Sequence, residues 1–370
     1  MPINNMNPEG LVKEIKIKNK NQAYKRRWKE PLFLDNNKPQ VSLENGLFLM
    51  PKYSTEETLN EKDDLESQIQ NLVQGENDRF LLILGEPLLY PHFRELYQKL
   101  RELGMIITIN TNGTLIDEAW ADFFAENKPR RINITLYGAS NETYERLCHY
   151  PGGFDKAVNG IRLLRERNID VKVNGSLAKA NVDDRMKIIE IGESLDAPVR
   201  IDTYMYPSVR ERNHAYNNQA RLDPEMAAKA RVEVLQREMG EEVFAQYRKI
   251  QLDEAENTPE GEAVPGQMAC RAGKSSFVVN WQGEMRSCVV LDKPSIPLRD
   301  VEFEEAWKFT KKETESLRIS ARCSSCKLRK VCNTCVAAAI AETGKADGVP
   351  EYLCRYTEAT VRYLKETSKK

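Results

Sequence analysis

The side chains best suited to chemistry in this sequence are cysteines close to its C-terminal end. Residues 323–335 read CSSCKLRKVCNTC, with four cysteines in thirteen positions. The last third of the chain contains seven cysteines: Cys270, Cys288, Cys323, Cys326, Cys332, Cys335 and Cys354. An eighth, Cys148, stands alone, and residues 1–147 contain none. Thiolates bind soft metal ions and iron–sulfur clusters, so any such chemistry belongs to the C-terminal third.

The spacing of these cysteines bears on what they hold. Zinc sites built from two CxxC pairs usually separate the pairs by ~15–20 residues, whereas five residues separate Cys326 from Cys332. Seven thiolates also exceed what one tetrahedral ion can bind, whereas two iron–sulfur clusters can use them all. The pattern therefore favours iron–sulfur clusters, with a single zinc ion and structural thiols as alternatives. The cations Lys327, Arg329 and Lys330 would offset thiolate charge or form an exposed loop.

Composition limits the partners and the compartment. The formal net charge is −1 and charged residues make up 30% of the chain, so neither nucleic acid nor an acidic membrane is an expected partner. No apolar run approaches the roughly 18 residues of a membrane span, and MPINNMNPEG lacks the apolar core of a signal peptide. We expect a cytoplasmic protein. In that reducing compartment clustered cysteines are metal ligands or redox groups more often than disulfides.

The elements that must position a site come from an alternating pattern upstream of the cysteines. Short apolar runs typical of strands cover 79–85, 105–113, 131–138, 170–178 and 199–206. Segments with helical spacing lie between them. This alternation predicts an α/β fold with parallel strands, a partial (β/α)6 TIM-like barrel in which residues 39–50 could supply a sixth strand. A doubly wound flat sheet is the competing topology.

Polar residues at the strand ends are the candidate ligand-binding groups, because ligands bind at the C-terminal ends of parallel strands. Each of these residues could instead belong to an ordinary turn. The candidates are Gly85, Glu86, Asn112, Thr135, Asn174 and Ser176. Glu86 stands out because its carboxylate, between a glycine and a proline, could hold an amine-bearing ligand.

The chain divides into four expected parts. Residues 1–38 are a basic N-terminal extension, 39–215 the partial barrel, 216–266 a helical linker region and 267–370 the cysteine-rich domain. Within the linker region, residues 223–256 predict one long helical segment that begins at Asp223, the expected N-cap.

The cysteine pattern resembles that of the SPASM domain of radical S-adenosylmethionine enzymes. The matching pattern is Cys270-(12 residues)-Gly283-(4)-Cys288, Cys323-x2-Cys326-x5-Cys332-x2-Cys335 and Cys354. CRAGKSSFVVNWQGEMRSC is similar to the opening hairpin of that domain. The family usually has three residues, not two, between the positions of Cys332 and Cys335. Upstream, LLILGEPLLYPHFRELYQKLRELG resembles the family segment with a Gly-Gly-Glu-Pro motif, where the glutamate region holds the amino group of S-adenosylmethionine.

The resemblance implies two 4Fe-4S auxiliary clusters in a C-terminal SPASM-type iron–sulfur domain. An outer cluster would use Cys323, Cys326, Cys332 and Cys354, and an inner one would use Cys270, Cys288 and Cys335. It also implies S-adenosylmethionine contacts from the six strand-end candidates. SPASM proteins frequently modify ribosomally made peptides, so a peptide or a partner maturase is the implied partner.

One family feature is missing. The family binds its S-adenosylmethionine-cleaving cluster through three cysteines spaced C-x3-C-x2-C after the first strand. One alignment places Asn45, Leu49 and Lys52 at these positions, and no cysteine precedes Cys148. Leu84 also replaces the first glycine of Gly-Gly-Glu-Pro. We therefore expect S-adenosylmethionine to bind weakly or not at all and its reductive cleavage to be absent.

Three functions follow from these patterns. The first is a degenerate radical-enzyme homologue that keeps its auxiliary clusters and acts as a binding or electron-transfer partner. The second is an active radical peptide-modifying enzyme with an unconventional first cluster, with ligands from another chain. The third is a zinc-stabilised interaction protein.

Overall fold

The computed structural model describes residues 79–83, 86–206, 220–280 and 282–367. Several sequence expectations lie outside these ranges: the basic extension, the sixth strand at 39–50, the positions of the missing cysteines, Leu84 and Gly85.

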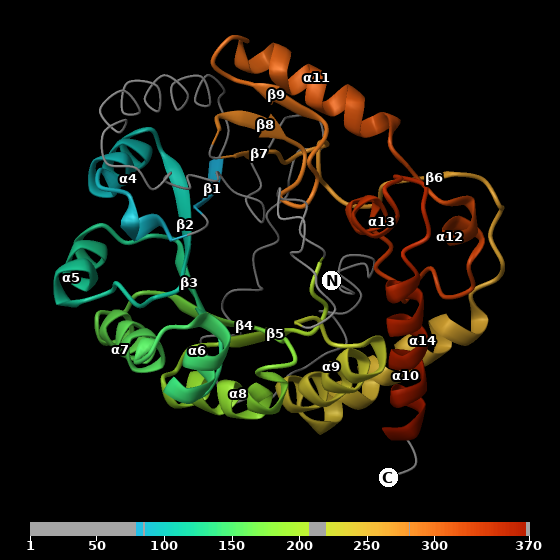
Figure 1. Ribbon diagram of the computed structural model, residues 1–370, viewed down its shortest axis with the longest axis horizontal. Coiled ribbons are helices and arrows are strands. Elements are labelled where there is room, and N and C mark those ends of the chain that lie inside the picture. Colours follow the sequence, from blue (N-terminus) through green and yellow to red (C-terminus); the bar gives the residue numbers. More distant parts are fainter. Residues whose placement is uncertain (1–78, 84–85, 207–219, 281, 368–370) are drawn as a thin grey trace.

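A five-stranded parallel sheet forms the first half of the described chain (Figure 1). Its strands are β1 (Arg79–Ile83), β2 (Met105–Thr111), β3 (Arg131–Leu136), β4 (Val171–Ser176) and β5 (Val199–Asp202). The intervening helices are α4 (Phe93–Glu102), α5 (Glu118–Glu126), α6 (Asn141–Cys148), α7 (Gly153–Glu166) and α8 (Arg185–Ser194). The predicted alternation of strands and helices is confirmed.

The strand order distinguishes the two predicted topologies. The strands lie in the sequential order β1-β2-β3-β4-β5, without the reversal that defines a doubly wound sheet. They curve around a central space, and the helices α4 to α8 lie on the outer side (Figure 1). The partial barrel is therefore correct for the described strands, and the doubly wound alternative is wrong.

The two faces of the sheet differ in polarity. Residues that face the helices are buried and apolar, as Ile109, Ile134 and Val173 show. The alternate residues are only half-buried, and polar side chains such as Asn133 and Asn174 are frequent among them. Because successive side chains of a strand point to opposite faces, the apolar face packs against helices and the polar face lines the inside of the barrel.

An aromatic cluster joins α4 to α5. Tyr97 and Phe124 are at most 1% exposed, and their ring centroids lie 5.8 Å apart in an edge-to-face arrangement. Phe93 and Phe123 extend the cluster on either side. The Tyr97 hydroxyl donates a hydrogen bond to the Asn127 carbonyl oxygen at 2.7 Å, so this buried polar group has a partner.

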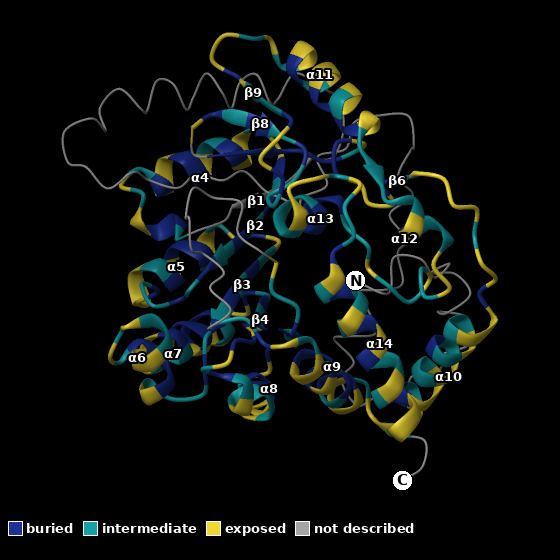
Figure 2. Cartoon of the chain, turned by 45° about the vertical axis from the view of Figure 1, so that its right-hand side comes forward, coloured by how far each residue is buried: buried dark blue, intermediate teal, exposed yellow. Residues whose placement is uncertain are grey.

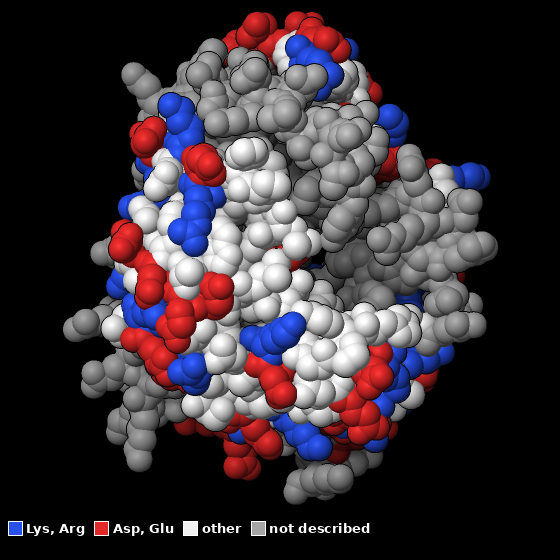
Figure 3. Space-filling model, turned by 60° about the vertical axis from the view of Figure 1, so that its left-hand side comes forward, with Lys and Arg blue, Asp and Glu red and all other residues white. Residues whose placement is uncertain are grey.

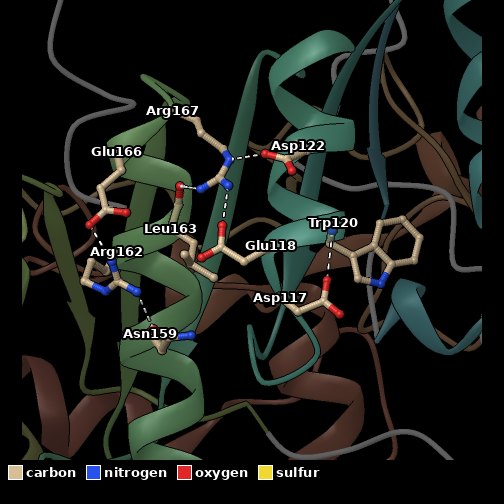
Figure 4. Close-up of polar contacts among 9 residues, drawn as sticks. All are labelled: Asp117, Glu118, Trp120, Asp122, Asn159, Arg162, Leu163, Glu166 and Arg167. Carbon is tan, nitrogen blue, oxygen red and sulfur yellow. Dashed lines mark hydrogen bonds and ion pairs between the residues drawn. The ribbon is translucent and has the colours of Figure 1, made fainter.

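Ion pairs join α5 to α7 at the surface (Figure 4). Arg167, at the end of α7, donates from Nε to Asp122 Oδ1 at 2.6 Å and also pairs with Glu118. Both carboxylates are more than half exposed. Basic and acidic side chains alternate over this outer surface (Figure 3). Solvent screens such pairs, so the buried rings contribute more to stability.

A second helical layer follows the barrel. The structure has two helices, α9 (Pro224–Met239) and α10 (Glu241–Asn257), where the sequence predicts one. The break falls at Gly240, whose φ of 73° interrupts the helix. Asp223 caps α9 as predicted, because its side chain accepts a hydrogen bond from the Met226 amide. The final helix, α14 (Glu351–Glu366), packs against both α9 and α10.

The cysteine-rich region contains short strands and four helices. The strands are β6 (Gly266–Gln267), β7 (Val278–Val279), β8 (Glu284–Arg286), β9 (Ser295–Pro297) and β10 (Arg318–Ile319). The helices before α14 are α11 (Phe303–Ser316), α12 (Ala321–Ser325) and α13 (Val336–Thr343). Buried residues lie along the inward sides of the helices (Figure 2). Among the helices that the structure describes, none is both long and apolar enough to cross a membrane.

Phe124→Ala should lower the free energy of unfolding by about 3–5 kcal/mol, because it leaves a cavity in the aromatic cluster. Arg167→Ala, which removes surface ion pairs and one hydrogen bond to the Leu163 carbonyl oxygen, is the control and should lose less stability than Phe124→Ala. Chemical denaturation of the two variants measures both effects. A larger loss for Arg167→Ala than for Phe124→Ala would contradict this account of the core.

Candidate functional site

Glu86 lies at the mouth of the barrel and contacts the end of β2. The Thr111 hydroxyl lies 2.7 and 2.9 Å from the two carboxylate oxygens of Glu86, and the Asn112 amide donates to Oε2 at 2.8 Å. A hydroxyl has one proton and a carboxylate has about four acceptor positions, so capacity remains for an amine donor. Burial raises the pKa of Glu86, and the hydrogen bonds from Asn112 and Thr111 act against that rise.

Thr111, the last residue of β2, is not among the six candidates chosen from the sequence, although it belongs to the same strand end as Asn112. Its hydroxyl also accepts a hydrogen bond from the Gly113 amide at 3.0 Å. Asn112 shapes the same turn, because its Oδ1 accepts from the Thr114 amide at 2.8 Å and from the Thr114 hydroxyl at 2.7 Å. The side-chain oxygen of Asn112 therefore stabilises the turn, and its role toward a cofactor remains a prediction.

The remaining strand-end candidates lie side by side on the polar face. Thr135 of β3 is in register with Asn174 of β4, which is in register with Arg200 of β5. Ser176 and Asp202 form the next pair toward the strand ends. The parallel sheet thus brings these predicted residues together with two charged residues that the sequence analysis did not single out.

Three of the seven cysteines form one group, the inner group. Cys270 follows β6, Cys288 follows β8, and Cys335 is the N-cap residue of α13. Burial raises the pKa of the Cys288 thiol to about 11, and the thiolates of Cys335 and Cys270 raise it further. Burial also raises the pKa of Cys335, and the Cys270 thiolate adds to that rise. Mutual repulsion of this kind requires the three sulfurs to lie near one another.

The other four cysteines form the outer group. Cys323 lies in α12, Cys326 directly follows that helix, Cys332 lies in the next loop and Cys354 lies in α14. Burial raises the pKa of Cys354 to about 12, and Cys332 and Cys323 raise it further. Burial likewise raises the pKa of Cys323, to which Cys332 and Cys326 contribute.

Hydrogen-bond donors also reach these sulfurs. The Val290 amide lies 3.4 Å from the Cys288 sulfur, and the Leu328 amide lies 3.4 Å from the Cys326 sulfur. Donors of this kind stabilise negative charge on metal-bound sulfur.

Cations in the cysteine loop hold this loop against the end of α10 and the segment after it. Lys330 pairs with Glu254 at 2.7 Å, and Lys327 pairs with Glu260 at 3.3 Å. Arg329 donates to the Pro259 carbonyl oxygen at 2.6 Å. These three side chains therefore bind the neighbouring segment. That they also offset thiolate charge remains a prediction.

The thiol chemistry of the two groups is compatible with iron–sulfur clusters, which remain the prediction for them. Over the described ranges, no three His, Cys, Asp or Glu side chains converge tightly enough to bind one metal ion. A zinc ion requires each sulfur at about 2.3 Å, whereas the sulfurs of a cluster stand apart because each binds a different iron. Bound iron would also supply the positive charge that such crowded thiolates lack. Cys148 belongs to neither group: it is half-buried at the end of α6, and burial raises its pKa.

Comparison with known proteins agrees with this fold. An S-adenosylmethionine-dependent heme synthase from Methanosarcina barkeri is 24% identical over 71% of this chain and 79% of its own length. The structure of native anSMEcpe with bound S-adenosylmethionine covers 86% of this chain and 92% of its own, with a TM-score of 0.61 and 19% identity.

A third protein has the same fold. SuiB from Streptococcus suis, bound to its precursor peptide SuiA, covers 79% of this chain and 68% of its own, with a TM-score of 0.55 and 16% identity. Residues 49–191 match the sequence model of the Radical SAM superfamily. Over this segment the chain is similar to the radical SAM superfamily, and the solved structures show the same fold.

Proposed function

We propose that this chain is a SPASM-type iron–sulfur protein that holds two four-iron auxiliary clusters and lacks the cluster that cleaves S-adenosylmethionine. In this role it acts as a binding or electron-transfer partner in the modification of a ribosomally made peptide. The observation that carries the proposal is the division of seven cysteines into groups of three and four.

The division supports two clusters because it agrees with the ligand sets implied by the cysteine pattern. Cys323, Cys326, Cys332 and Cys354 would provide a complete set of thiolates for the outer cluster. The three cysteines of the inner group would leave one iron open or bound by another ligand. The clusters would supply one-electron redox chemistry, while the chain's own residues position them.

The sequence supports the absence of the third cluster. The match to the superfamily begins at residue 49, within the stretch where the cluster cysteines belong, and no cysteine precedes Cys148. Without that iron, nothing chelates the amine and carboxylate of S-adenosylmethionine. Glu86, held by Thr111, would lie on the opposite side of such a pocket.

A peptide partner is supported by SuiB, which has this fold and was determined with its precursor peptide. The similarity to a heme synthase over 71% of the chain favours a second candidate, a tetrapyrrole. A shift of the heme absorption band on titration with this protein would favour the tetrapyrrole over the peptide.

Anaerobic reconstitution should yield about eight iron atoms and as many sulfide ions per chain. The double substitution Cys326→Ala with Cys332→Ala should remove about half of this iron, because it disables the outer group. Cys270→Ala with Cys335→Ala should remove the other half, and Cys148→Ala should remove none. Iron, zinc and acid-labile sulfide assays measure these outcomes. One or two zinc ions without sulfide would reject the clusters in favour of the zinc-stabilised alternative.

With a strong reductant and S-adenosylmethionine, the isolated chain should release no 5′-deoxyadenosine. The sulfonium must contact a reduced cluster, and no three thiolates are present at the first strand to hold one. Adding a candidate peptide should not change this outcome, because the peptide does not supply the three ligands. Chromatographic detection against a metal-free control measures the product. Release above that control would replace the partner role with the unconventional active enzyme.

A further inference from the structure

The chain that leaves β5 runs directly to the inner cysteine group. Two tyrosines follow the strand, Tyr204 and Tyr206, and their ring centroids lie 4.8 Å apart in an edge-to-face contact. The Tyr206 hydroxyl lies within hydrogen-bonding reach of the Cys335 sulfur. The end of the barrel sheet thus contacts a proposed cluster ligand.

Arg221 lies behind these tyrosines and is almost enclosed. Its guanidinium carbon stands 3.4 Å from the ring centroid of Tyr352 and 5.1 Å from that of Tyr204. One guanidinium nitrogen lies 3.0 Å from Glu342 Oε1, and the two side chains are only 11% and 14% exposed. A planar guanidinium can stack on aromatic rings and pair with a carboxylate at the same time, which an ammonium group cannot do equally well.

This ion pair fixes α13 relative to the barrel. Cys335 is the N-cap residue of α13, and Glu342 lies in its last turn. A helix is stiff over this length, so holding Glu342 also restricts where Cys335 lies. Two further bonds hold α14 to the same region: Thr203 Oγ1 and the Tyr356 hydroxyl lie 3.0 Å apart, and the Tyr352 hydroxyl donates to the Leu222 carbonyl oxygen at 2.7 Å.

We propose that Arg221 is a positioning residue that fixes α13 to the end of the barrel sheet and thereby keeps the Tyr206 hydroxyl bonded to the Cys335 sulfur. This inference rests on the proposed function where it concerns the inner cluster. Reduction places additional negative charge on cluster sulfur, and a donor at that sulfur stabilises the reduced form. Tyr206 therefore raises the reduction potential of the inner cluster, and Arg221 maintains that effect from a distance.

The metal-free protein tests the positioning role independently of any cluster. Arg221→Met should lower the Tm by about 5 °C or more, because it leaves the buried Glu342 carboxylate without its cation and with only the Tyr204 hydroxyl, 3.4 Å away, as a partner. A double-mutant cycle with Glu342→Gln should give a combined loss smaller than the sum of the single losses. The matched control is Arg322→Met, which removes the exposed pair with Glu351 beside the outer group and should change the Tm by about 1 °C or less.

The reconstituted protein tests the effect on the inner cluster. Tyr206→Phe should shift one of the two potentials to more negative values while the iron content stays unchanged. Arg221→Lys, which keeps the charge and spares the fold, should shift the same potential in the same direction by a smaller amount. Arg322→Met should leave that potential unchanged. Redox titration followed by electron paramagnetic resonance measures both clusters in each variant.

The outcomes separate this inference from the proposed function. Unchanged potentials in Tyr206→Phe, with two clusters present, would overturn the role of Tyr206. Additive losses of Tm in the Arg221 and Glu342 cycle would overturn the positioning role of Arg221. Reconstitution with fewer than two clusters would instead refute the proposed function, and the Tm cycle would still decide whether Arg221 fixes α13.

Discussion

The burial of clustered thiols is the constraint on which the rest of this structure depends. Burial raises the pKa of Cys288, Cys323, Cys335 and Cys354, and neighbouring cysteines of the same group add to that rise. Thiols whose pKa is raised in this way stay protonated near neutral pH, so a metal that binds there must displace their protons. The cysteines come from helix ends, a hairpin and the helix α14, which hold them from several sides.

Those helices connect the cysteine groups to the barrel. The helices α9 and α10 follow the last strand, and α14 packs against both of them. Cys354 lies on α14, and Glu254 near the end of α10 pairs with Lys330 of the cysteine loop. The same layer therefore supports the outer group and covers the edge of the barrel. A structural change in the outer group or in the barrel edge would therefore alter the contacts of the other.

The sequence predicted the barrel well because its signals are local. Apolar runs of the right length followed by helical spacing identify β1 to β5, and the order of strands follows from parallel crossovers. The fifth strand was predicted too long, to residue 206, because Tyr204 is as suitable for a strand as for the packing it has against α14. The break at Gly240 was missed because helical spacing continues on both sides of that glycine.

The site was harder to predict because its residues depend on contacts between distant segments. Thr111 reads as an ordinary strand residue, and only the fold brings its hydroxyl to Glu86. Arg221 precedes the helix α9 in a segment without regular apolar spacing. Its partner Glu342 lies 121 residues further along the chain. The division of the cysteines into two ligand sets came from the resemblance to a family pattern and remains a prediction. Spacing alone could not have separated three sulfurs from four.

The bond between Thr203 and Tyr356 spans 153 residues of sequence, which has a consequence for how the protein is made. A ribosome completes the sheet long before it synthesises α13 and α14. The nascent barrel can fold as a unit from local contacts. The residues around Tyr204 stay uncovered until α13 and α14 have been synthesised. During that interval the edge of the sheet at Tyr204 is open to the surroundings, so chaperones would meet the chain at this stage of its synthesis.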